Sequence, residues 1–130
     1  MLLKESKLNV VDNSGVIKVR CIRVVDLGVK RYGYVGNLLL VVITKQNFTK
    51  KLCKKTIYFG LIVAVKQQVL RTDGSIVKFG ANRVILFSKA FKFLGTRITG
   101  SFMKEVRLNT LKTKEKQKFL KILSYSKYLI

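Results

Sequence analysis

Short runs of apolar residues, separated by turn-forming residues, recur along this chain, and such runs are typical of β-strands. They predict strands over residues 8–11, 16–25, 38–44, 60–65 and 82–87. In the second run, Ile17 and Val19 alternate with basic residues, but the alternation slips after Cys21. A β-bulge would return the following apolar side chains to the core, so we expect one near Cys21 and Ile22.

A β-hairpin is predicted between the last two strands, over residues 69–79. Asp73-Gly74 forms the expected turn, because a two-residue type I′ turn needs positive φ at both central positions and Asp-Gly adopts them readily. This turn would place Leu70 opposite Val77. Since side chains alternate between the two faces of a strand, one face would be apolar and the other cationic. The apolar face would carry Leu70, Val77 and Phe79, and the cationic face would carry Arg71 and Lys78.

The C-terminal tail has a helical pattern over residues 112–123, with an apolar patch among lysines. Strands, turns and helix together predict an all-β protein: a small five-stranded closed β-barrel with hairpin extensions and a short C-terminal helical tail. We expect one domain over residues 1–130, with the barrel over about 8–100 and the tail over about 101–130. The helix is expected to pack on the barrel, and the alternative is a helix lying on a membrane surface. Phe91 and Phe93 are expected to fill core space rather than stack on bases.

The charge balance indicates what kind of partner this fold binds. The 130 residues include 27 Lys or Arg and only 6 Asp or Glu, for a formal net charge of +21. Such self-repulsion indicates a polyanionic partner. Nucleic acid is the favoured partner, and an anionic membrane surface is the alternative. The longest apolar runs are far shorter than the ~18–20 residues that a membrane-spanning helix needs, so no membrane span is predicted.

The chain lacks the residue types that most catalytic and metal sites require. It has no histidine, and no two carboxylates are spaced for general acid–base chemistry or for metal binding. Cys21 and Cys53 are isolated, so a zinc site has too few ligands, and free thiols are favoured over a disulfide between them. We therefore expect no enzyme activity, no cofactor and no metal. The turn contexts of Asp12, Asp26 and Asp73 assign these acids to backbone hydrogen bonds.

Candidate RNA contacts gather in the predicted loops. Lys30, Arg31 and Tyr32 lie in a glycine-containing loop, where the cations suit phosphate and the tyrosine suits stacking on a base or sugar. A polar segment between two apolar strands carries lysine pairs at 50–51 and 54–55. For both loops, a solvated tip without a partner is the alternative. The predicted RNA-binding residues are Lys30, Arg31, Tyr32, Lys50, Lys51, Lys54, Lys55, Arg71, Lys78, Arg97, Lys104 and Arg107.

Four blocks of residues follow one another in a specific order. They are LNVVDNSG at 8–15, KRY at 30–32, GLIV at 60–63 followed by Asp73-Gly74, Phe79 and Asn82, and GTRITG at 95–100 followed by KEVR at 104–107. In this order and spacing they resemble the universal large-subunit ribosomal protein L-fourteen family, in its bacterial and organellar form. The resemblance covers residues 8–123. Two departures are Asn37, where the family has an acid, and Ser101, where a proline is common.

The resemblance implies a structural constituent of the large ribosomal subunit that binds large-subunit rRNA. It also implies a place on the intersubunit face, with Arg97, Lys104 and Arg107 nearest that face, and a bridge to small-subunit rRNA. L-nineteen-type and L-three-type proteins and a ribosome silencing factor are the implied protein partners. The absence of proline and the many residues with AT-rich codons favour a mitochondrial ribosome, with a plastid or the bacterial cytoplasm as alternatives. The alternative function is a free basic RNA-binding barrel that acts as an RNA chaperone or regulator.

Overall fold

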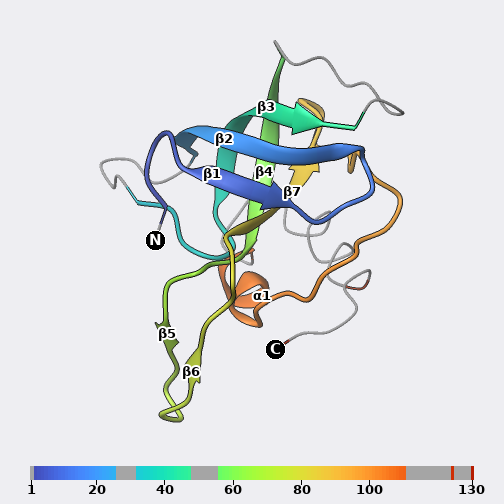
Figure 1. The fold of residues 1–130 in the computed structure, drawn as a ribbon. Helices are drawn as coiled ribbons and strands as arrows, with labels where there is room; N and C mark the ends of the chain where they lie inside the picture. The colour runs from blue at the N-terminus through green and yellow to red at the C-terminus, as the bar shows by residue number, and fades with distance from the viewer. Residues whose placement is uncertain (1, 26–31, 48–55, 111–123, 125–129) are drawn as a thin grey trace.

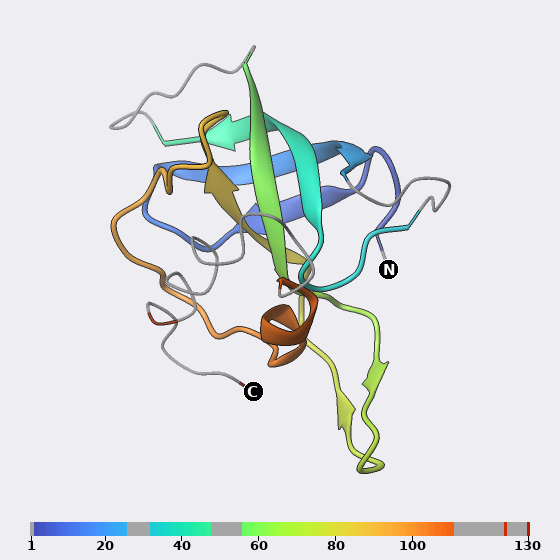
Figure 2. The same ribbon diagram turned by 180° about the vertical axis from the view of Figure 1, so that it is seen from behind.

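A closed five-stranded β-barrel forms the body of the protein (Figures 1 and 2). The computed structural model describes residues 2–25, 32–47, 56–110, 124 and 130. Neighbouring strands follow the order β1-β2-β3-β4-β7, and a parallel pairing of β1 with β7 closes the ring. The strands are β1 (Lys7–Val10), β2 (Val16–Val24), β3 (Leu38–Gln46), β4 (Ile57–Ala64) and β7 (Arg83–Phe87). The predicted closed barrel and its five strands are confirmed.

Alternating side chains fill the barrel interior. Val19 and Cys21 are fully buried, while Arg20 between them is exposed, as the two-residue period of a strand requires. The Val84 side chain of β7 packs over Gly60 of β4, where a Cβ atom would lie 2.7 Å from Val84 Cγ2. Only glycine avoids that contact, and this explains a glycine in the middle of an apolar strand.

The predicted β-bulge in β2 is confirmed. Cys21 pairs with Val41 of β3, whereas the next paired residue of β2 is Arg23, opposite Leu40. The register therefore shifts by one residue at Ile22. The extra residue changes which side chains point inward, and it increases the local twist that a small barrel needs to close.

The β5–β6 hairpin has a different turn from the predicted one. Strands β5 (Val69–Leu70) and β6 (Ile76–Val77) place Leu70 opposite Ile76 rather than Val77. The loop is longer than two residues, because the Arg71 N–H donates to the Ser75 carbonyl at 2.9 Å and the Gly74 N–H donates to the Arg71 carbonyl at 3.1 Å. Only Gly74 in this turn has a positive φ, of 88°, so a type I′ turn is excluded.

Two hydrogen bonds to the Asp73 side chain explain the longer turn. The Asp73 carboxylate accepts the Ser75 N–H at 2.9 Å and the Ser75 hydroxyl at 2.6 Å. These bonds hold Asp73 in a local Asx turn, and Gly74 then supplies the left-handed residue of a longer hairpin loop. The expected role of Asp73 in a turn is confirmed, although the predicted turn type is wrong.

The one-residue change of register also corrects the predicted faces of the hairpin. Leu70 is 74% exposed and Ile76 is 59% exposed, while Val69 and Val77 pack against the core. A shift of one residue moves a side chain to the opposite face of a strand. Leu70 therefore points to solvent, and the prediction that it lies on the apolar face is wrong. The hairpin projects away from the barrel (Figure 1).

The helix α1 (Glu105–Thr110) lies beside the base of this hairpin, at one end of the barrel (Figures 1 and 2). Phe102, Met103 and Val106 are fully buried there, and the Met103 N–H donates to the carbonyl of Val63 in the barrel wall at 3.0 Å. The predicted helix at 112–123 lies outside the described residues. No helix within the described part of the chain is long and apolar enough to cross a membrane.

Phe91 and Phe93 pack against the barrel wall, as predicted. The Phe91 ring stacks on Phe59 with their centroids 4.6 Å apart, and the Phe93 ring lies 6.2 Å from Phe87 at a tilt of 54°. Both rings extend the hydrophobic core outward. Their apolar surface therefore stabilises the fold.

Candidate nucleic-acid interface

The predicted RNA-binding residues divide into those that the structure describes and those that it does not. Lys30, Arg31 and the four lysines of the lysine loop, Lys50, Lys51, Lys54 and Lys55, lie outside the described residues. The described members are Tyr32, Arg71, Lys78, Arg97, Lys104 and Arg107. All of these except Arg71 are exposed, so five of them present surface to solvent.

The segment that carries Arg97 is fixed to the turn between β1 and β2. The Asn13 side-chain oxygen accepts the N–H groups of Thr96 at 2.7 Å and of Arg97 at 3.1 Å. The Asn13 amide also donates to the Thr96 hydroxyl at 2.7 Å. Two sequence blocks more than eighty residues apart thus form one surface, and the Arg97 side chain projects from a backbone that is held in place.

A buried acid anchors this turn to the barrel. The Asp12 carboxylate accepts the Ser14 N–H at 3.0 Å and the Ser14 hydroxyl, and its second oxygen accepts the Leu86 N–H of β7 at 3.1 Å. On the other side of the segment, both the N–H and the hydroxyl of Thr99 donate to the Val11 carbonyl. The sequence predicted the local Asx turn of Asp12, but not its hydrogen bond to β7.

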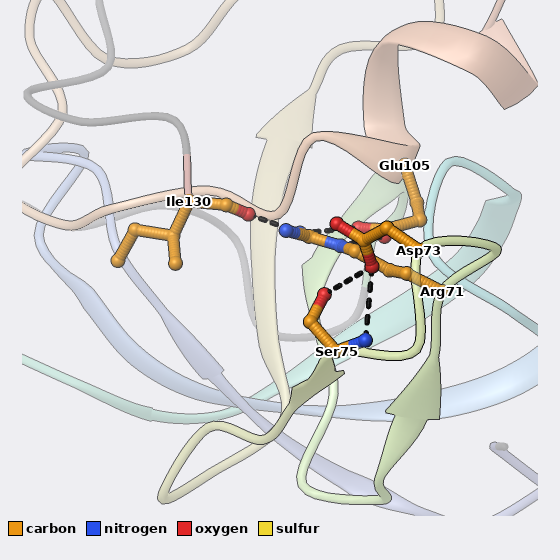
Figure 3. Close-up of polar contacts among 5 residues, drawn as sticks. All are labelled: Arg71, Asp73, Ser75, Glu105 and Ile130. Carbon is orange, nitrogen blue, oxygen red and sulfur yellow. Dashed lines mark hydrogen bonds and ion pairs between the residues drawn. The ribbon is translucent and has the colours of Figure 1, made fainter.

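Arg71 makes contacts within the protein. Its Nε donates to Glu105 Oε1 at 2.7 Å, its Nη2 donates to Glu105 Oε2 at 3.3 Å, and Nη2 also donates to the carbonyl of Ile130 (Figure 3). The hydrogen bond to Glu105 raises the pKa of Arg71, and the charges of Glu105 and Asp73 add to the effect. The predicted contact of Arg71 with RNA therefore competes with an ion pair that joins the hairpin to α1.

Tyr34 is an exposed aromatic residue outside the predicted RNA-binding set. It is 50% exposed, and Tyr32, a member of that set, is 40% exposed. The two tyrosines flank the buried Gly33, so the signal was present in the sequence as the alternation Tyr-Gly-Tyr. Alternate residues of an extended segment share a face, and both rings are therefore presented together.

The described residues offer no arrangement suited to covalent or metal chemistry. No group of three His, Cys, Asp or Glu side chains lies close enough among them to hold a metal ion. The Cys21 thiol is buried in the barrel, and burial, with a smaller effect of the Glu5 charge, raises its pKa to about 11. Such a thiol is a poor nucleophile at neutral pH.

A closed barrel with exposed cations, among them Arg97 on an anchored segment, defines a basic binding protein. The whole chain, residues 1–130, matches the family described as Ribosomal protein L14p/L23e. The large ribosomal subunit protein uL14 of Carsonella ruddii (strain PV) is 32% identical over 130 residues, which are 100% of both chains. The chain belongs to the ribosomal protein L14p/L23e family. Its place is the large subunit of the ribosome, where it is a structural component and not an enzyme.

Proposed function

We propose that this protein binds large-subunit rRNA by neutralising phosphates with an array of cations. The observation that carries the proposal is that the acids of the described residues are already engaged. Glu5 pairs with Arg20 at 3.3 Å and Glu105 pairs with Arg71, while Asp12 and Asp73 accept hydrogen bonds within turns. Even if all 6 acids neutralised one cation each, 21 of the 27 cations would remain for a partner.

The proposed contacts are mostly to phosphate and sugar, because folded RNA presents its backbone rather than its base edges to a protein surface. Arginines are the strongest candidates, since a guanidinium can donate to two phosphate oxygens at once. The proposed set is Lys30, Arg31, Tyr32, Lys50, Lys51, Lys54, Lys55, Arg71, Lys78, Arg97, Lys104 and Arg107. Within it, Arg97, Lys104 and Arg107 would lie nearest the small subunit and contribute to a bridge with its rRNA.

The proposed protein partners are L-nineteen-type and L-three-type neighbours in the large subunit, and a ribosome silencing factor. Pull-down of intact free large subunits with the silencing factor tests the last of these, and failure to capture the subunits would remove it. A mitochondrial ribosome is the proposed location, on the basis of the AT-rich residue usage. Organelle fractionation followed by immunoblotting tests this assignment.

Sucrose-gradient sedimentation of a cell lysate tests the central proposal. We expect the protein to migrate with large subunits and complete ribosomes in moderate salt. Recovery at the top of the gradient, together with RNA binding by the free protein, would instead favour the RNA chaperone or regulator.

Salt dependence and substitution test the phosphate contacts directly. If six or more phosphates are engaged, the affinity of the full chain for rRNA should fall by about 10³-fold or more between 50 and 200 mM salt. Arg97→Ala should weaken binding and reduce the salt slope, because one phosphate contact is lost. Lys92→Ala removes an exposed cation outside the proposed set, so it should leave the slope unchanged. A flat salt response in the unmodified protein would contradict the proposal.

A further inference from the structure

A short backbone pairing brings the N-terminal segment against the segment of the two exposed tyrosines. The Leu2 N–H donates to the Gly33 carbonyl and the Gly33 N–H donates to the Leu2 carbonyl, both at 2.8 Å. This is an antiparallel bridge, so Leu3 lies opposite Tyr32. The bridge lies outside the barrel strands and joins two segments about thirty residues apart.

The bridge sorts side chains between the core and the solvent. Leu2 is 1% exposed and Gly33 is buried, so this bridged pair faces the barrel. The neighbouring positions point the other way: Leu3 is 50%, Tyr32 is 40% and Tyr34 is 50% exposed. Two aromatic rings and one aliphatic side chain therefore share an outward surface, which we call the tyrosine platform (Leu3, Tyr32 and Tyr34).

The backbone beneath the platform is held on both sides. The Tyr34 N–H donates to the Asn37 side-chain oxygen at 2.7 Å, and the Asn37 N–H returns a bond to the Tyr34 carbonyl at 3.1 Å. The Gly36 N–H donates to the Ile62 carbonyl of β4 at 2.8 Å. At Gly33 a Cβ atom would lie 3.1 Å from Ile62 Cδ1, so the segment packs tightly on the wall. Exposed rings on such a backbone are pre-organised for binding.

The charge around the platform favours a nucleic acid over a protein surface. Lys4 follows Leu3, and Lys30 and Arg31 directly precede Tyr32 in the sequence. The nearby acid Glu5 pairs with Arg20 at 3.3 Å, so it does not offset these cations. Aromatic rings beside surplus cations are the combination that binds unpaired nucleotides, because the base stacks while the phosphates are neutralised.

We propose that Tyr32 and Tyr34 form a stacking site for unpaired bases of RNA, with Leu3 packing against the edge of the stacked base. The proposal rests on the proposed rRNA binding and adds a base-contacting site to a mainly phosphate-directed surface. Stacking on an aromatic ring needs no particular base, so the site recognises an unstacked nucleotide rather than a sequence. An unpaired loop or bulge of the RNA is the expected ligand.

Two RNA probes of equal charge test the site. One is a single-stranded oligoadenylate, and the other is an abasic ribose-phosphate oligomer of the same length. The full chain should bind oligoadenylate more tightly, by roughly 5- to 100-fold for one stacked base. Tyr34→Ser and Tyr32→Ser should each reduce that difference, whereas Tyr34→Phe should keep it, because the ring remains.

Matched controls separate this site from the rest of the surface. Tyr58→Phe changes a buried tyrosine and should alter neither affinity. Equal affinity of the unmodified chain for both probes would overturn the stacking site while leaving phosphate binding intact. Serine variants that bind both probes like the unmodified chain would also overturn it. If neither probe bound at low salt, both proposals would fail.

Discussion

The guanidinium of Arg71 lies against the carboxylate of Glu105, with Nε 2.7 Å from Oε1 and Nη2 3.3 Å from Oε2. Arg71 belongs to the hairpin that projects from the barrel, and Glu105 begins α1 (Figure 3). The two side chains are only 22% and 20% exposed, so solvent screens the pair less than it would on an open surface. This pair joins α1 to a hairpin that has only two residue pairs of its own.

Acid should release the hairpin from α1. Burial alone would raise the pKa of Glu105, but the hydrogen bond from Arg71, a backbone N–H and the charges of Arg71 and Lys104 hold it below the ordinary 4.5. The pKa of Glu105 is thus lower in the folded protein than in the unfolded chain. The ion pair therefore contributes its full stability at pH values above the unfolded pKa, and this stability is lost as the pH falls through the folded pKa. In NMR spectra, the Arg71 Nε–H resonance should keep its shift at neutral pH and change below pH 4.5.

The Glu105→Gln variant is the control for this titration. Its side chain does not ionise, so the Arg71 resonance should show no acid transition of this origin. An Arg71 signal that titrates identically in both proteins would contradict the role given to the ion pair.

Asp12→Asn should destabilise the barrel by about 1–3 kcal/mol, because one backbone donor loses its charged acceptor in a buried site. The side chain of Asp12 joins the β1–β2 turn to Leu86 of β7. Urea unfolding measures the change. Asp73→Asn is a matched control, since Asp73 makes the same local bonds to Ser75 in an exposed turn without joining two strands. Equal midpoint shifts for the two variants would show that the bond to β7 adds nothing.

Gly95→Ala should displace the segment that carries Arg97. A Cβ atom at Gly95 would lie 2.8 Å from Asn13 Oδ1 and 3.1 Å from Asp12 Cβ, so the Asn13 hydrogen bonds must shift. We expect a loss of about 1–3 kcal/mol in the free energy of unfolding, together with weaker rRNA binding. Gly80→Ala is the control, since a Cβ atom there would meet no atom of another segment within 4 Å, and substitution should change neither quantity. Unchanged stability and binding in the Gly95 variant would contradict the proposed anchoring.

The barrel could be predicted from sequence because its signals are local and redundant. The apolar runs predicted as strands at 38–44 and 60–65 are short and rich in β-branched residues, which favours strands, and the slip after Cys21 marks the bulge. The hairpin turn could not be settled in this way. Asp-Gly is compatible with more than one loop, and the Ser75 hydrogen bonds to Asp73 decide which one forms.

The candidate site was less predictable because it depends on which cations the fold pairs with acids. The sequence shows Arg71 and Glu105 as isolated charges, and only the packing of α1 beside the hairpin brings them together. Likewise, nothing local to Asn13 indicates that it would hold Thr96 and Arg97. Composition correctly indicated a surplus of positive charge, but tertiary contacts determine where that surplus is presented.

The buried thiol of Cys21 should resist modification in the folded protein. Burial raises its pKa from 9.0 to about 11. At pH 8 the folded protein therefore holds about 100-fold less Cys21 thiolate than the unfolded chain. A Cys53→Ser variant isolates this thiol, and its reaction with an aromatic disulfide reagent should be at least about 100-fold slower in buffer than in denaturant. Because the unfolded thiol ionises first, stability should also fall as pH rises above 9.0.

The complementary Cys21→Ala variant leaves Cys53 as the remaining thiol and controls for the reagent itself. If Cys21 reacted at the same rate in the folded and the denatured chain, the interior of the barrel would be open to the reagent. That result would contradict the packing of β2 against β3, on which the positions of the anchored loops depend.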